Sequence, residues 1–357
     1  MIEQSSIDVS VIIPVYNGVD KGLEKCIKSI ISQSVKNIEV VVIDDHSKDD
    51  SLNLIKKLLS NFEKAKIIEN DINLGLSKTW NKGILNSNGR YILLMHQDCI
   101  LSDENQIENA YLYLKEHPEI DGIIGTRIYH DFNKLNFFQK FFEFRINHFL
   151  ENLYLDDSIV FTENKVDIYK KELLIEIGLF NEELRNAGED HIFSYKIREK
   201  NAKIIKGNIL KYYDDLGDVS TFKQVLKKEW LYGTTLPFVF LNVYNYKKNN
   251  LKIKKKSILQ NKIINRFFSY FWIIGFLLSL IFYILNYNLV LVLIPFILSL
   301  LIRALHIIIL HFKIVKNLND LKLNLIANLF MTYLFDFIYS MAGFYAIFMY
   351  LFKNRHN

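Results

Sequence analysis

Several acidic and polar residues in the first 190 residues of this 357-residue chain directly follow short apolar runs. Asp44 and Asp45 follow Val40–Ile43, and the group His96-Gln97-Asp98 follows Tyr91–Met95. Carboxylate oxygens are the ligands that hard divalent ions such as Mg²⁺ prefer, and an imidazole nitrogen favours Mn²⁺. These residue types can therefore supply ligands to a metal ion, and their places after the apolar runs indicate a site.

The apolar runs themselves have the lengths and patterns of buried strands, and they alternate with segments of helical periodicity. Strands are expected at Val9–Val15, Val40–Ile43, Lys66–Ile68 and Tyr91–Met95, and helices at Leu23–Ser32, Ser51–Leu59, Lys78–Leu85 and His191–Lys200. This alternation predicts an α/β fold with a mostly parallel, doubly wound sheet. Ligands of such sheets bind beyond the carboxyl ends of the strands, where Tyr16-Asn17, Asp44-Asp45 and His96–Asp98 all fall.

Five ordered motifs then carry a resemblance to a known family. They read VSVIIPVYNG (Val9–Gly18), VVVIDDHSKDDS (Val40–Ser51), NLGLSKTWNKG (Asn73–Gly83), YILLMHQDC (Tyr91–Cys99) and AGEDH (Ala187–His191). In order and spacing this series resembles the family 2 glycosyltransferases of the GT-A fold, over roughly residues 7–235. The resemblance implies a Rossmann-like domain that binds a nucleotide-sugar donor.

The resemblance assigns donor contacts to residues at the strand ends. It implies that Asp45 accepts the imide proton of the base, while Asp44 is a local cap or a ribose contact. Asn73 and Gly75 open the next helix, for which an ordinary glycine turn is the alternative. Lys78 is placed to reach a phosphate or else is a solvated lysine. The other donor contacts implied are Pro14, Tyr16, Asn17 and Gln97, with an ordinary strand-ending turn as the alternative for Pro14–Asn17.

The metal motif departs from the family pattern, because His96-Gln97-Asp98 replaces Asp-x-Asp. Asp98 matches the aspartate that touches the metal. His96 is either a nitrogen ligand that favours Mn²⁺ or a hydrogen-bond partner of the ribose or a phosphate. A histidine that often follows in the family is not evident, since Tyr212-Tyr213-Asp214-Asp215 stands in that region. The resemblance therefore implies a divalent cation, Mn²⁺ or Mg²⁺, held by Asp98 with His96.

An acidic pair, Glu189-Asp190, precedes a helical stretch. Such a pair by itself is often only a capping and dipole feature. Within the family pattern, Asp190 is the residue expected to deprotonate the acceptor hydroxyl.

The last third of the chain indicates a membrane region. The segment Lys247–Arg266 contains eight cations and no acid, and it directly precedes apolar sequence. A juxtamembrane segment that faces anionic lipid is therefore expected rather than a nucleic-acid site. The apolar stretches Phe267–Leu285 and Leu289–Leu310 are long enough to cross a bilayer and return, with the positive loop His311–Lys322 in the cytosol.

A third apolar stretch, Leu323–Phe352, is expected to be a span, or else re-entrant or interfacial. Three crossings would place the basic tail Lys353–His356 outside, against the positive-inside rule. Earlier in the chain, the phenylalanine-rich segment between Thr126 and Asp157 is either buried core or an interfacial helix.

These readings divide the chain into a GT-A domain (1–235), a basic juxtamembrane linker (236–266) and two to three transmembrane helices (267–352). No cleavable secretory signal is expected at the amino terminus, and Cys26 and Cys99 fit a reduced cytosol. The expected function is inverting transfer from a nucleotide diphosphate sugar to a hydroxyl of a membrane-associated, lipid-linked or saccharide acceptor. Transfer would take place at the inner face of the cytoplasmic membrane, in cell-surface glycan synthesis. The alternatives are transfer to polyprenyl phosphate, and a non-catalytic scaffold that retains the fold.

Overall fold

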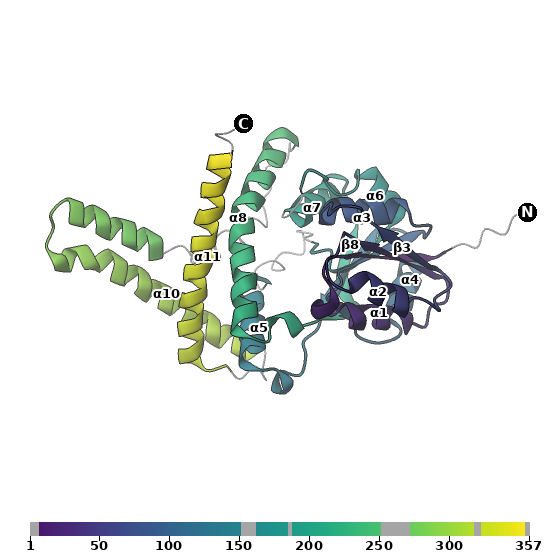
Figure 1. Ribbon diagram of the computed structural model, residues 1–357, viewed down its shortest axis with the longest axis horizontal. Helices are drawn as coiled ribbons and strands as arrows, with labels where there is room; N and C mark the ends of the chain where they lie inside the picture. Colours follow the sequence, from purple (N-terminus) through teal and green to yellow (C-terminus); the bar gives the residue numbers. More distant parts are fainter. Residues whose placement is uncertain (1–6, 151–161, 185–187, 251–271, 318–322, 354–357) are drawn as a thin grey trace, which may run out of the picture. The chain divides into compact units, whose positions relative to one another are not determined.

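The computed structural model describes residues 7–150, 162–184, 188–250, 272–317 and 323–353 (Figure 1). The chain forms two compact units, one of residues 1–130 with 160–218 and one of residues 131–159 with 219–357. The first unit holds the sheet and the second is helical. Helix α8 (Phe222–Asn250) runs without a break through the domain boundary expected at residue 235.

An eight-stranded sheet forms the centre of the first unit, in the order β3-β2-β1-β4-β7-β6-β8-β5. Strands β3, β2, β1 and β4 are parallel, β7 is antiparallel to both of its neighbours, and β5 is antiparallel to β8. The mostly parallel sheet expected from the sequence is thereby confirmed. The strands are β1 (Val9–Val15), β2 (Ile38–Asp44), β3 (Ala65–Glu69), β4 (Tyr91–Met95), β5 (Cys99–Leu101), β6 (Gly122–Arg127), β7 (Val166–Lys170) and β8 (Ile204–Asp214).

Helices cover both faces of this sheet, which is why its central strands are apolar throughout (Figure 1). Helices α1 (Leu23–Ile31), α2 (Ser51–Leu58) and α4 (Gln106–Glu116) pack on one face. Helices α3 (Leu76–Leu85), α6 (Lys171–Glu176) and α7 (Glu189–Glu199) pack on the other. The predicted elements agree with these bounds to within two residues. Short 3₁₀ turns lie at Val19–Lys21, Phe132–Lys134 and Gly217–Val219.

The second unit contains α5 (Phe137–Leu150), α8, a helix at Trp272–Ile284, α10 (Leu289–Asn317) and α11 (Leu325–Lys353). Among the described residues, Leu289–Phe312 and Leu325–Met349 are long and apolar enough to cross a membrane. The predicted span from Phe267 begins outside the described residues, as does most of the basic segment Lys247–Arg266. The loop expected from His311 starts later, since α10 continues to Asn317.

The phenylalanine-rich segment is helical over α5, and its two alternative interpretations can be compared residue by residue. Phe141, Phe142 and Phe144 are buried, with the Phe141 ring 5.4 Å from that of Phe335 in α11. These three side chains therefore belong to the core of the second unit. Phe137 and Phe138 are partly exposed.

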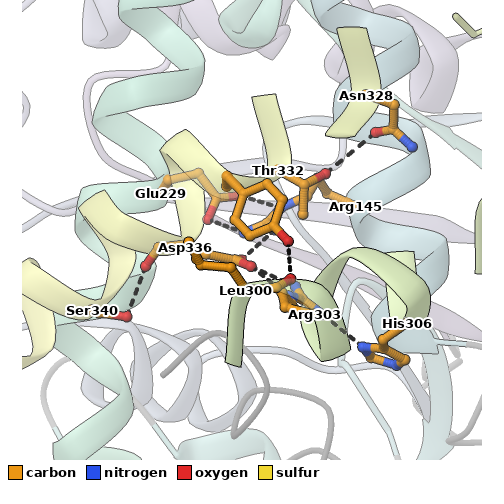
Figure 2. Close-up of polar contacts among 10 residues, drawn as sticks. Arg145, Glu229, Leu300, Arg303, His306, Asn328, Thr332, Asp336 and Ser340 are labelled. Atoms are coloured by element: carbon orange, nitrogen blue, oxygen red, sulfur yellow. Dashed lines mark hydrogen bonds and ion pairs between the residues drawn. The ribbon is translucent and has the colours of Figure 1, made fainter. Parts of the chain in front are cut away.

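A buried ion network joins four helices of this unit (Figure 2). Arg145 of α5 donates to both carboxylate oxygens of Glu229 in α8, at 3.1 and 2.7 Å, and to Asp336 of α11 at 2.9 Å. Arg303 of α10 donates to the other oxygen of Asp336 at 2.7 Å. Two guanidinium groups thus balance two carboxylates. The balance matters because an unpaired charge in a dry interior is strongly destabilising.

Asp336→Asn should lower the thermal stability of the second unit, because it leaves Arg145 and Arg303 with an uncompensated positive charge. The expected loss is about 3–5 kcal/mol. Unfolding of the detergent-solubilised full chain can be followed by the fluorescence of Trp230 and Trp272, which lie in this unit. Glu24→Gln, which breaks an exposed pair with Lys28, is the control and should leave the melting temperature unchanged. Equal melting temperatures for both variants would contradict the role of the network.

Candidate active site

The loop after β1 carries Tyr16 and Asn17, and it is shaped by bonds to the segment that follows β2. Asn17 lies in the left-handed region with φ 49°, which asparagine tolerates better than most residues. Its N–H donates to Ser47 Oγ at 3.0 Å, and its side-chain oxygen accepts from the Lys48 N–H at 2.7 Å. The Gly18 N–H donates to Ser51 Oγ at 2.7 Å. The two strand ends therefore form one connected rim.

Gln97 connects the ends of β1 and β4. The Tyr16 N–H donates to Gln97 Oε1 at 3.0 Å, and Gln97 Nε2 donates back to the Tyr16 carbonyl at 3.2 Å. This reciprocal pair fixes the backbone at Tyr16, a residue that is 42% exposed. Pro14 lies inside β1, opposite Ile43 of β2.

Asp45 is the best-connected of the predicted donor residues. Its buried carboxylate accepts from the backbone N–H groups of Leu74 at 2.8 Å and Gly75 at 2.9 Å, and from Asn70 Nδ2 at 2.8 Å. Three donors offset the cost of burying this charge. Asp45 therefore positions the loop before α3.

Asp44 has a different environment. Its Oδ2 accepts from the Ser47 N–H at 3.1 Å, a local bond in the turn that follows β2. Its Oδ1 is buried and has no hydrogen-bond partner among the described residues.

The start of α3 holds the next group of predicted residues. Gly75 precedes the helix with φ 85° and ψ 164°, a conformation that is essentially restricted to glycine. Asn73 Nδ2 donates to the Asp45 carbonyl at 3.2 Å, which ties this turn to the end of β2. Lys78 is exposed in the first turn of α3. The turn thus combines the Asp45-bound N–H groups of Leu74 and Gly75 with an exposed cation, Lys78, at the helix start.

His96 and Asp98 lie between β4 and β5. Burial lowers the pKa of His96, although the nearby Asp98 opposes this shift, so the imidazole is neutral and can act as a nitrogen ligand. The Asp98 carboxylate is partly exposed, and the Cys99 thiol lies 3.9 Å from its Oδ1.

The donor set of these two residues fits a divalent ion only in part. Among the described residues, no group of three or more His, Cys, Asp and Glu side chains is placed to hold a metal. One accessible carboxylate and one neutral imidazole can still supply ligands to an ion that is also bound by a diphosphate. The residues present therefore fit a metal that arrives with its phosphorylated ligand.

A second charged group, which the sequence did not single out, lies next to Asp98. Asp214 at the end of β8 pairs with Lys165 at 2.8 Å and with Arg127 at 2.6 Å. Burial would raise the pKa of Asp214, but these cations outweigh it and hold the pKa well below its usual range. Burial would likewise lower the pKa of Lys165, but Asp214 and Asp98 keep it well above its usual range. Lys165 is thus a fixed positive charge near the proposed metal ligand.

The segment Tyr212–Asp215, in which the histidine often found in the family was not evident, therefore contributes to this ion cluster. His130 also reaches it, with Nε2 2.7 Å from the Asp214 carbonyl and its ring stacked on Tyr213. Lys165 and Arg127 lie 49 and 87 residues from Asp214 in sequence, so no local spacing could have indicated the cluster. The only local signal was the acidic pair Asp214-Asp215 at a strand end.

Asp190 is in the first turn of α7, after Gly188 with φ 92°. Its Oδ1 accepts from the His191 N–H at 2.8 Å, and its carbonyl accepts from Ser194 Oγ at 2.7 Å. Ser194 in turn accepts from the Thr162 N–H at 3.1 Å. The segment that begins at Thr162 leads to Lys165, whose carbonyl accepts from the His96 N–H at 2.8 Å. The first turn of α7 is thus linked through this segment to the end of β4.

Comparison with known proteins agrees with this geometry. The glycosyl transferase family 2 model matches residues 10–178. The glycosyltransferase GlyG of Streptococcus pneumoniae is 30% identical over 130 residues, which cover 36% of this chain and 42% of that protein. The poly(ribitol-phosphate) beta-glucosyltransferase of Bacillus spizizenii is 26% identical over 214 residues, covering 57% of this chain and 32% of its own length. The chain thus spans less than half the length of these relatives.

A solved structure extends the similarity of fold. The mannosyltransferase of Pyrobaculum calidifontis, in complex with GDP-Man and Mn²⁺, superposes with a TM-score of 0.58 at 13% identity. The match covers 95% of this chain and 87% of that one. With the matched motifs at the edge of the sheet, the match over residues 10–178 indicates a glycosyltransferase domain of family 2 within this chain, and the fold is that of the GT-A glycosyltransferases.

Proposed function

We propose that this protein is an inverting glycosyltransferase that moves a sugar from a nucleotide diphosphate sugar to a hydroxyl of a membrane-associated acceptor. The observation that carries the proposal is the bonded rim at one edge of the sheet. There the ends of β1, β2 and β4 and the start of α3 meet through Gln97, Asn17 and Asp45. This is the edge at which ligands of such sheets bind.

The donor nucleotide would lie along this rim. Asp45 would accept the base imide proton, and Asp44 would serve as a cap or a ribose contact. Pro14, Tyr16, Asn17, Asn73, Gly75 and Gln97 would line the base, ribose and phosphates. Lys78 and Lys165 supply positive charge for the diphosphate, which is already anionic before transfer.

Asp98, with His96, would hold a divalent cation together with the donor phosphates. When bound, such a cation stabilises negative charge on the departing nucleoside diphosphate. The partly exposed Asp98 carboxylate and the neutral His96 imidazole suit Mn²⁺ at least as well as Mg²⁺. The Mn²⁺ of the Pyrobaculum mannosyltransferase supports this assignment.

Asp190 would act as the general base. It would take the proton of the acceptor hydroxyl as the oxygen attacks the anomeric carbon opposite the leaving diphosphate, which inverts the configuration. The bond between its Oδ1 and the His191 N–H orients the carboxylate.

The acceptor would be a lipid-linked saccharide of cell-surface glycan synthesis, reached at the inner face of the cytoplasmic membrane. The two long apolar helices and the basic sequence Lys247–Arg266 support the location. The similarity to a relative named for poly(ribitol-phosphate) supports a cell-surface acceptor. If the acceptor were a polyprenyl phosphate, its oxygen would already be anionic and no base would be required.

Asp190→Asn should keep donor affinity and lower turnover by about two to four orders of magnitude, the usual contribution of a general base. The assay is nucleoside diphosphate release from a panel of UDP and GDP sugars by the full chain in native membrane lipid. Glu189→Gln is the neighbouring control and should retain most activity. Normal turnover of Asp190→Asn would instead favour a phosphate acceptor, and no release with any donor would contradict the enzymatic proposal.

Asp45→Asn should weaken nucleoside diphosphate binding by about 1–3 kcal/mol, since an amide cannot accept from all the donors that now surround the carboxylate. Titration calorimetry with UDP and with GDP measures this loss. Asp71→Asn, at an exposed position of the same loop, is the matched control. Equal affinities in the three proteins would reject the role of Asp45 in donor binding.

Removal of divalent ions with EDTA should abolish transfer, and Mn²⁺ should restore it at least as well as Mg²⁺. Asp98→Ala should lose most of the metal affinity, because Asp98 is the single carboxylate of its motif. His96→Ala should narrow the preference for Mn²⁺, which accepts imidazole better than Mg²⁺ does. Full activity in EDTA, with Asp98→Ala unimpaired, would refute the metal assignment.

A further inference from the structure

Helix α8 carries cations at both of its ends. Lys223, Lys227 and Lys228 lie in its first turns, and Lys247 and Lys248 lie near its end, with an uncharged stretch between Glu229 and Lys247. The 29 residues of this helix correspond to about 43 Å, enough by length alone to cross a bilayer. Length does not tell whether α8 crosses the membrane or lies along its surface. Its charges and the segments to which it is joined decide between the two.

Both ends of α8 belong on the side of the membrane that holds the catalytic unit. The helix begins at Phe222, a short link after β8 of the first unit ends at Asp214. It ends at Asn250, inside the segment Lys247–Arg266 with its eight cations. Positive segments next to apolar spans remain on the cytoplasmic side. A helix with both ends on one side lies along the membrane surface, where its uncharged middle suits the lipid boundary.

Helix α11 packs along α8, and the two run in the same direction. The ring of Phe222 lies 5.8 Å from that of Phe335, and the ring of Trp230 lies 5.9 Å from that of Tyr345. One turn after Trp230, a methyl group at Gly233 would collide with the Tyr339 carbonyl and the Ala342 side chain. The two helices are therefore closely packed side by side (Figure 1).

The ion network is a second constraint on how deep α11 lies in the membrane, besides its packing along α8. Asp336, near the middle of α11, bonds directly to Arg145 of α5, which bonds to Glu229 at the charged start of α8 (Figure 2). Helix α5 has 14 residues and includes Lys140, Glu143 and Arg145, so it is too short and too charged to cross lipid. The middle of α11 therefore lies beside α5 and the start of α8, and Arg303 of α10 reaches the same level through its bond to Asp336.

We propose that α11 does not cross the bilayer but lies along α8 at its cytoplasmic surface, with its remaining apolar face on lipid. That face includes Ile326, Phe330, Phe337, Met341, Phe344 and Phe348, all of which are exposed. Of the described helices, only Trp272–Ile284, as part of the longer apolar stretch Phe267–Leu285, and α10 then cross the bilayer, as a hairpin. Of the two long apolar helices, α11 is the less apolar and the more buried, as a surface helix should be.

This arrangement resolves the charge conflict that three crossings create. With two crossings, Lys353 and Arg355 remain on the cytoplasmic side, as the positive-inside rule requires. The inference rests on the cytoplasmic placement of the catalytic unit in the proposed function.

Single cysteines test the proposal in the full-length protein, because native Cys26 and Cys99 are both buried. Tyr287→Cys, in the hairpin turn, should react with a membrane-impermeant maleimide in intact cells. Asn357→Cys and Lys28→Cys should react only after permeabilisation. Labelling of Asn357→Cys in intact cells would overturn the proposal, as would protection of Tyr287→Cys. Labelling of Lys28→Cys in intact cells would instead overturn the cytoplasmic placement, and donor turnover reports separately on catalysis.

A matched pair of lysine substitutions gives an independent readout. Leu298 in α10 and Met341 in α11 are exposed to similar extents, 52% and 45%. Leu298→Lys would place a charge within lipid and should reduce the yield of membrane-inserted protein by about tenfold or more. Met341→Lys should keep the yield within about twofold, since a surface lysine can extend to water. An equal loss in both variants would mean that α11 also crosses.

Discussion

The requirement that a buried carboxylate be matched by donors shapes the active-site edge of the first unit. Asp45 is buried at the end of β2, and its charge would be very costly there without partners. The partners are backbone N–H groups of the loop before α3, so the carboxylate fixes where that loop turns. Gly75 makes the turn possible, and α3 begins directly after it. The rim that we propose for the donor depends on this one interaction.

The same constraint recurs wherever charge is buried in this chain. Asp214 is balanced by Lys165 and Arg127 next to the proposed metal ligand, and Asp336 is balanced by Arg145 and Arg303 in the helical unit. In the first case the balance leaves Lys165 partly accessible and positive, which suits an anionic diphosphate. In the second case the groups are almost fully enclosed, and the network ties together helices from distant parts of the chain.

The order and type of most elements could be predicted because their signals are local. Runs of valine and isoleucine in β1 and β2 are apolar on both faces, and only a strand covered on both sides of a sheet satisfies them. The turn residues Asn17, Gly75 and Gly188 mark the ends of elements because they occupy backbone conformations that few side chains adopt. The polar residues that follow the parallel strands had to meet at one edge.

The partners of those residues could not be predicted, because a hydrogen bond across the fold leaves no periodic trace in the sequence. Gln97 bonds to Tyr16 across 81 positions, and Arg145 bonds to Asp336 across 191. The sequence by itself determined the sheet, the carboxylates at its edge and the apolar character of the last third of the chain. Only the tertiary structure decided which charges are paired and which face of α11 is covered, since pairing and burial depend on distances between segments that the chain brings together only on folding.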